Sequence, residues 1–76
     1  MLSSGEQLII NLVPNEGEML YDDLYLSVRD ARDGDPTLLR GMVKNGTLKQ
    51  RLEKTRADGK WVFKLFISRG GNNANI

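Results

Sequence analysis

The spacing of the apolar residues changes at Gly46, and this change constrains the fold more than any other feature of the 76-residue chain. Before Gly46 the apolar residues recur three or four positions apart, which is typical of amphipathic helices. After it they alternate with polar residues, which indicates β-strands. We therefore expect an α+β chain in which the helices precede the strands.

The residues before position 32 predict two helices. Ser4 and Gln7 have the spacing of a capping box and predict a first helix that ends at Pro14, although a strand over residues 8–13 is an alternative. A second helix is predicted over residues 18–31. The negative charge of Glu18 at its N-terminus would interact favourably with the helix dipole. Its apolar repeat is Leu20, Leu24, Val28 and Ala31.

A third helix is predicted after Asp35-Pro36, with the aspartate as N-cap and the proline at the first helical position. Asn45-Gly46 would end it. Its buried residues would be Leu38, Leu39, Met42 and Val43. Gly41 costs about 1 kcal/mol relative to alanine inside a helix. This indicates either that another backbone or a partner approaches closely, or that the helix is loosely formed.

Two alternating segments joined by Asp58-Gly59 predict a C-terminal β-hairpin. One of its faces would carry Trp61, Phe63, Leu65 and Ile67. Val62 and Phe66 fall on the opposite face, and a domain this small cannot cover both faces. We therefore expect Val62 and Phe66 to form a dimer contact or a pocket for the first helix. Residues 69–76 have no pattern and predict a disordered tail.

The net charge of +1 hides a division between the two halves of the chain. Residues 1–38 hold two Arg against eight Asp or Glu, a net charge of −6. Residues 39–76 hold nine Lys or Arg against two Asp or Glu, a net charge of +7. A basic half of this kind indicates a polyanion-binding surface, with a chance distribution as the alternative.

The chain has no Cys and no His, which excludes disulfides, thiol nucleophiles, structural zinc sites and imidazole bases. The carboxylates at positions 22, 23, 33 and 35 lack the spacing of a calcium loop. We therefore expect no enzyme activity, no metal, no other cofactor and no small-molecule substrate. No apolar segment approaches the roughly 18 residues of a membrane span.

The small size and the lack of disulfides favour a homodimer. The N-terminal residues do not resemble a secretory signal, so we expect an intracellular protein, cytoplasmic or nucleoid-associated.

The order of three helices and a β-hairpin resembles a winged-helix DNA-binding domain over residues 4–68. Residues 38–48 resemble the end of the recognition helix and the first wing strand, and residues 60–65 resemble the returning strand. The resemblance implies an α+β, three-helix winged helix-turn-helix fold with a C-terminal β-hairpin wing. It also implies that the third helix enters the major groove while the wing lies along the backbone or minor groove.

Carried onto this sequence, the resemblance gives two sets of DNA-binding positions. Those on the third helix are Thr37, Arg40, Gly41 and Lys44. Those on the wing are Lys49, Arg51, Lys54, Arg56 and Lys60.

Both sets lie in or next to the basic half, which predicts a small protein that binds double-stranded DNA, a transcriptional regulator acting as a homodimer. Since Arg40 alone on the third helix suits a bidentate contact with guanine, we expect mainly phosphate contacts. Trp61 is expected to be partly buried at the base of the wing. The alternative function is a winged-helix adaptor that binds proteins and no DNA.

Overall fold

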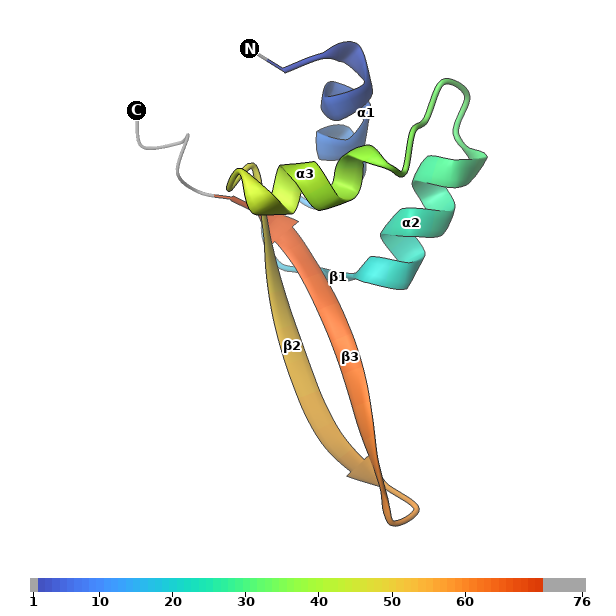
Figure 1. The fold of residues 1–76 in the computed structure, drawn as a ribbon, viewed down its shortest axis with the longest axis vertical. Helices are drawn as coiled ribbons and strands as arrows, with labels where there is room; N and C mark the ends of the chain where they lie inside the picture. The colour runs from blue at the N-terminus through green and yellow to red at the C-terminus, as the bar shows by residue number, and fades with distance from the viewer. Residues whose placement is uncertain (1, 71–76) are drawn as a thin grey trace.

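The computed structural model describes residues 2–70 as three helices and one three-stranded antiparallel sheet (Figure 1). The helices are α1 (Ser4–Leu12), α2 (Tyr21–Asp30) and α3 (Leu38–Lys44). The strands are β1 (Met19–Leu20), β2 (Leu48–Ala57) and β3 (Lys60–Arg69). The expected α+β class with a C-terminal hairpin is confirmed.

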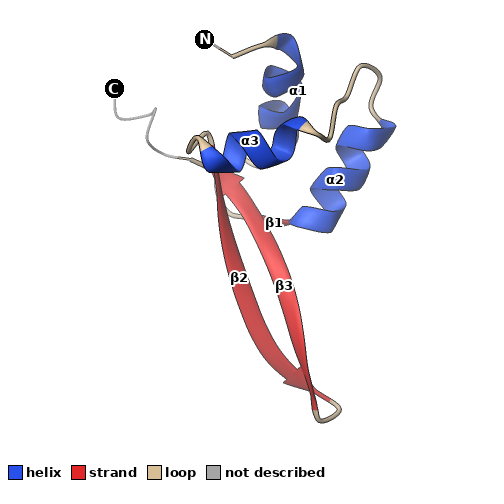
Figure 2. Cartoon of the chain, viewed as in Figure 1, coloured by secondary structure: helices blue, strands red, loops and turns tan. Residues whose placement is uncertain are grey.

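The three helices gather at one end of the hairpin formed by β2 and β3, and the rest of the hairpin extends away from them (Figure 2). In the sheet order β1-β3-β2, the central strand is β3. β1 pairs only with the helical end of β3, with Met19 opposite Ile67 and Leu20 opposite Phe66. The longest dimension of the molecule is 45 Å, and the hairpin runs along it.

The hydrophobic core lies where the helices meet the base of the hairpin. Every helix and both long strands contribute to it, and its fully buried side chains are Ile9, Val13, Leu24, Val28, Leu39, Met42, Leu48 and Ile67. Burial of each such side chain contributes roughly 1.5–3 kcal/mol of hydrophobic free energy. The burial expected for Leu24, Val28, Leu39 and Met42 is confirmed.

The first segment is a helix, so the strand alternative for it is wrong, and the helix begins one residue before the predicted start. Its N-cap is Ser3, not Ser4. The Glu6 N–H donates to Ser3 Oγ at 3.2 Å, and the Ser3 N–H donates to the Glu6 carboxylate at 2.9 Å. A charged Glu6 gains more from the helix dipole than a neutral Gln7, which explains the choice between two possible capping boxes.

The second helix begins three residues later than predicted, because residues 19–20 form β1 instead. Gly17 takes a φ of 89°, which turns the chain before the strand. Leu20 is extended, with φ −66° and ψ 139°. The strand pairs with β3, whose residues lie far along the chain, so local apolar spacing could not reveal it. Glu18 therefore precedes a strand and is not at the start of a helix.

The third helix also begins later than predicted, at Leu38. The Asp35 carboxylate accepts a hydrogen bond from the Thr37 N–H at 3.1 Å, which is the bond expected of the predicted N-cap. The Leu38 and Leu39 N–H groups donate to the carbonyl oxygens of Asp35 and Pro36, so one tighter turn separates Asp35 from the α-helix. Gly46, with a φ of 88°, ends the helical segment as expected. The hairpin turn is confirmed too, because Asp58 and Gly59 both have positive φ, 51° and 76°.

Arg69 joins the end of the hairpin to the end of α1. Its guanidinium donates to the carbonyl oxygens of Ile10 at 2.9 Å and Val13 at 3.2 Å at the C-terminal end of the helix, where carbonyl groups lack their full set of helical partners. Gly70 is buried, and its N–H donates to the Thr47 carbonyl oxygen at 2.9 Å. The prediction of a disordered tail is therefore wrong for residues 69 and 70, which are ordered by these contacts. Residues 71–76 lie outside the described part.

Two glycine substitutions should change stability in opposite directions. A Cβ at Gly41 would have nothing within 4 Å among residues 2–70, so the prediction that another backbone approaches Gly41 closely is wrong for this part of the chain. Gly41→Ala should raise the free energy of unfolding by up to about 1 kcal/mol through helix propensity. A Cβ at Gly34 would collide with the Val28 carbonyl oxygen, so Gly34→Ala should destabilise the protein. Urea denaturation of both variants tests this, and a stabilised Gly34→Ala would contradict it.

Candidate nucleic-acid interface

The hairpin and α3 together line a concave surface. A hollow of about 560 Å³ lies between them, lined by Tyr21, Arg40, Val43, Lys44, Gln50 and Leu65. A second hollow of about 370 Å³ shares Tyr21 and Leu65 and continues along the hairpin to Leu52 and Phe63. Arg40 and Lys44 of α3 are exposed and line the first hollow, so two of the predicted DNA-binding residues face the hairpin.

The strand register divides the hairpin side chains between two faces, because directly opposed residues share a face. We call the face that includes Gln50 and Leu65 the α3-side face, since both residues line the hollow beside α3. Its cross-strand pairs are Leu48–Arg69, Gln50–Ile67, Leu52–Leu65, Lys54–Phe63 and Arg56–Trp61. The pairs of the far face are Lys49–Ser68, Arg51–Phe66, Glu53–Lys64, Thr55–Val62 and Ala57–Lys60.

The predicted wing residues are therefore separated. Lys54 and Arg56 lie on the α3-side face, where strands β2 and β3 carry no Asp or Glu. Lys49, Arg51 and Lys60 lie on the far face, together with Glu53. Thr37 and Gly41, the remaining predicted residues of the α3 region, are exposed. The register thus places Lys54 and Arg56 on the same face of the hairpin as Gln50 and Leu65, the two residues that border the hollow beside Arg40 and Lys44, and it places Lys49, Arg51 and Lys60 on the other face.

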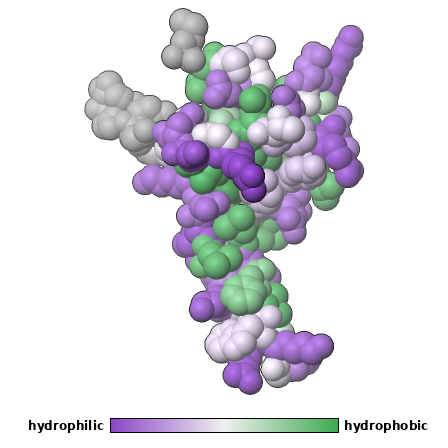
Figure 3. Space-filling model, in the orientation of Figure 1, coloured by the Kyte–Doolittle hydropathy of each residue, from purple (hydrophilic) through white to green (hydrophobic). Residues whose placement is uncertain are grey.

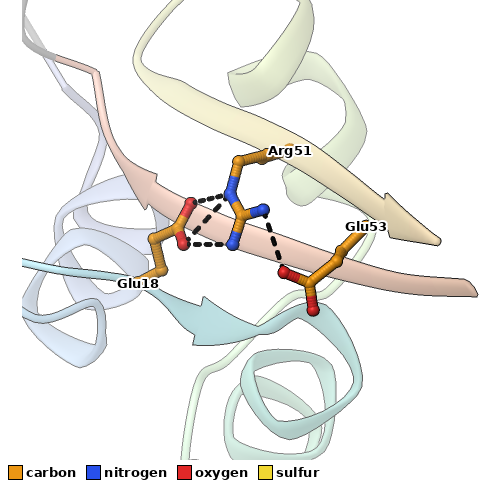
Figure 4. Close-up of polar contacts among 3 residues, drawn as sticks. All are labelled: Glu18, Arg51 and Glu53. Carbon is orange, nitrogen blue, oxygen red and sulfur yellow. Dashed lines mark hydrogen bonds and ion pairs between the residues drawn. The ribbon is translucent and has the colours of Figure 1, made fainter. Parts of the chain in front are cut away.

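Arg51 is held between two carboxylates (Figure 4). Its Nε and Nη2 donate to the two oxygens of Glu18 at 2.9 and 2.8 Å, and its Nη1 donates to Glu53 at 3.3 Å. The guanidinium also lies 4.8 Å from the Phe66 ring centroid. The hydrogen bonds from Arg51 hold the pKa of Glu18 below its usual range, and those to Glu18 and Glu53 raise the pKa of Arg51 further. These contacts give Arg51 a structural role, fastening β2 to the segment before β1.

The two residues predicted as a dimer contact differ in their surroundings. Phe66 is partly buried, opposite Leu20 of β1 and under the Arg51 guanidinium. Val62 lies farther from the helices, 36% exposed, opposite Thr55. Because the chain's own residues already contact Phe66, Val62 is the more accessible of the two, and the homodimer stays a prediction.

Trp61 lies close to the hairpin turn and is 59% exposed, so its expected burial at the base of the hairpin is wrong. Phe63 and Leu52 on the same face are each 57% exposed. Figure 3 shows apolar side chains along the hairpin, with hydrophilic ones at its tip. The sequence contained the signal for this position, because Trp61 is only two residues from the Gly of the predicted turn. Sequence reasoning missed that the helices would cover only the opposite end.

No protein-family model, curated protein or solved structure matches this chain. Within residues 2–70, no three carboxylates are grouped so that they could hold a metal ion. The helices described in the same range are too short or too polar to cross a membrane.

The Glu18–Arg51 pair should make stability depend on pH in the acid range. Because the folded-state pKa of Glu18 is lowered, its contribution is complete above the unfolded-state pKa and is lost as the pH falls through the folded-state value. Glu18→Gln should therefore lower the unfolding midpoint at neutral pH, and the difference from wild type should vanish as the pH falls from about 5 to about 2. Glu16→Gln removes a nearby exposed carboxylate and serves as the control. An effect of Glu18→Gln that is the same at every pH would contradict this assignment.

Proposed function

We propose that this chain is a winged-helix protein that binds double-stranded DNA through α3 and the hairpin. The observation that carries the proposal is the concave surface, which Arg40 and Lys44 of α3 line together with Gln50 and Leu65 of the hairpin, and the hairpin face of Gln50 and Leu65 continues outward to Lys54 and Arg56. Within residues 2–70 none of these four cations forms an ion pair, so their charges are available to phosphates. A surface of unpaired cations binds DNA mainly through its backbone.

The dimensions of the two elements suit a duplex. α3 has seven residues, about 10 Å of helix, and the major groove is about 12 Å wide. Each hairpin strand has ten residues, about 34 Å if fully extended, which corresponds to roughly ten base pairs along the helix axis. α3 in a groove would therefore leave the hairpin long enough to follow the neighbouring backbone.

The acidic residues support the same orientation. Leu24 and Val28 of α2 are buried, and Asp23 and Asp30 are exposed on other sides of that helix. Asp22 is the exception, because it lines the second hollow. DNA approaching the α3-side face would avoid most of the carboxylates on α2, with Asp22 as the nearest repulsive charge.

A role as a transcriptional regulator extends this proposal. A single α3 offers only Arg40 for a bidentate base contact, so two copies would be needed to read two half-sites. A homodimer with two-fold symmetry supplies the second helix. The expected cytoplasmic or nucleoid-associated location fits this function.

Removal of two cations from α3 should weaken DNA binding and its salt dependence together. The Arg40→Ala/Lys44→Ala variant should lower affinity for a duplex of about two helical turns, and the slope of log affinity against log salt should fall by about 1.8 if each cation contacts one phosphate. Asp22→Asn should raise the affinity, because it removes the carboxylate nearest to the approaching DNA. Fluorescence anisotropy of a labelled duplex at several salt concentrations measures both effects.

The matched control removes the same charge elsewhere. Arg29→Ala/Arg32→Ala alters two exposed arginines of the acidic half and should leave the salt slope nearly unchanged. If wild-type protein shows no binding to duplex DNA at low salt and tens of micromolar, the proposal fails and the adaptor alternative is favoured.

A further inference from the structure

Two cross-strand pairs at the outer end of the α3-side face each join an aromatic ring to a cation. Phe63 lies opposite Lys54, and Trp61 lies opposite Arg56. The Arg56 guanidinium is 5.3 Å from the Trp61 ring centroid, so the two side chains are in contact. We call these four residues the aromatic–cation ladder. A nucleotide is itself a planar ring joined to an anion, and each pair offers a partner for both parts.

The spacing of the ladder fits nucleobases. Residues two apart on a strand are separated by about 6.8 Å, twice the rise per residue. Stacked bases are separated by about 3.4 Å along a strand of DNA. The backbone positions of Trp61 and Phe63 are therefore about two base steps apart along the strand, so the repeat of the aromatic residues matches the repeat of stacked bases.

The charge of the surroundings favours a nucleic acid over a protein or a second copy of this chain. The α3-side face of β2 and β3 carries Lys54 and Arg56 and no carboxylate, which suits a polyanion. A second copy packed face to face would bring these cations against their equivalents. Exposed aromatic rings interleaved with cations are the arrangement that stacks bases in single-stranded DNA.

Resting on the DNA-binding function above, we propose that the aromatic–cation ladder binds unpaired bases, so that the preferred ligand is a duplex that continues into a single-stranded segment. The bases of an intact duplex are already stacked on one another, and separating them has an energetic cost. Unpaired bases stack on Trp61 and Phe63 without that cost, while their phosphates reach Lys54 and Arg56. α3 holds the adjoining duplex.

The experiment uses Trp61 itself as the probe, because it is the only tryptophan of the chain. The full-length protein is titrated with a blunt duplex of about two helical turns and with the same duplex carrying a single-stranded thymine overhang. We expect the overhang to raise affinity about tenfold or more for each base stacked. We also expect tryptophan emission to be quenched by the overhang DNA and much less by the blunt duplex.

Two variants locate the effect on the ladder. Phe63→Ala retains the tryptophan. It should lower the affinity for overhang DNA about tenfold and leave the affinity for the blunt duplex unchanged. Thr55→Ala lies between Lys54 and Arg56 in the sequence but on the far face, and should change neither affinity. Because Phe63 is exposed and outside the core, Phe63→Ala should fold, as circular dichroism can verify.

The possible results separate this proposal from the DNA-binding proposal. Equal affinity and equal quenching with both DNAs would overturn the ladder proposal and leave duplex binding intact. Absence of binding to either DNA would overturn both. A blue shift of Trp61 emission that depends on protein concentration alone, with a doubled mass in light scattering, would show instead that a second copy covers this face.

Discussion

The core of eight buried side chains covers only one end of the hairpin, and the rest of the structure depends on this limit. Leu48 and Ile67 at the base of the hairpin are buried by the helices. The same face continues outward through Leu52, Phe63 and Trp61, each of which is more than half exposed. A chain of this size has too few apolar residues to cover ten-residue strands on both sides. The exposed apolar face is therefore a direct result of a long hairpin on a small helical body.

Long-range polar contacts fix the angle at which the hairpin leaves that body. β1 pairs with β3, Arg51 joins β2 to Glu18, and Arg69 binds the last carbonyls of α1. Each contact joins residues far apart in the sequence, and all lie at the base of the hairpin. Because Arg51 and Arg69 make these contacts, they are not free to contribute to the basic surface that composition alone suggested. The cations left on the α3-side face are fewer, and Lys54 and Arg56 share that face of the hairpin.

The arrangement gives the two halves of the proposed interface different tasks. Arg40 and Lys44 are exposed side chains of α3, a helix that contributes Leu39 and Met42 to the core. The aromatic–cation ladder lies at the outer end of an arm that is supported only at its base. A rigid element suits a duplex of regular shape, and a protruding arm suits a single strand whose path varies. The division follows from how far each element lies from the buried core.

Local sequence was sufficient for the elements whose cause is local. Apolar spacing identified α2 and α3 apart from their starts, and Asp58-Gly59 identified the hairpin turn, because positive φ at two successive residues needs such a pair. β1, the structural roles of Arg51 and Arg69, and the exposure of Trp61 were decided by contacts between distant parts of the chain. The sequence by itself determined the helices, the turn and the alternation of side chains between two faces. Only the tertiary structure decided which face continues from α3, because that depends on where the helices pack on the hairpin.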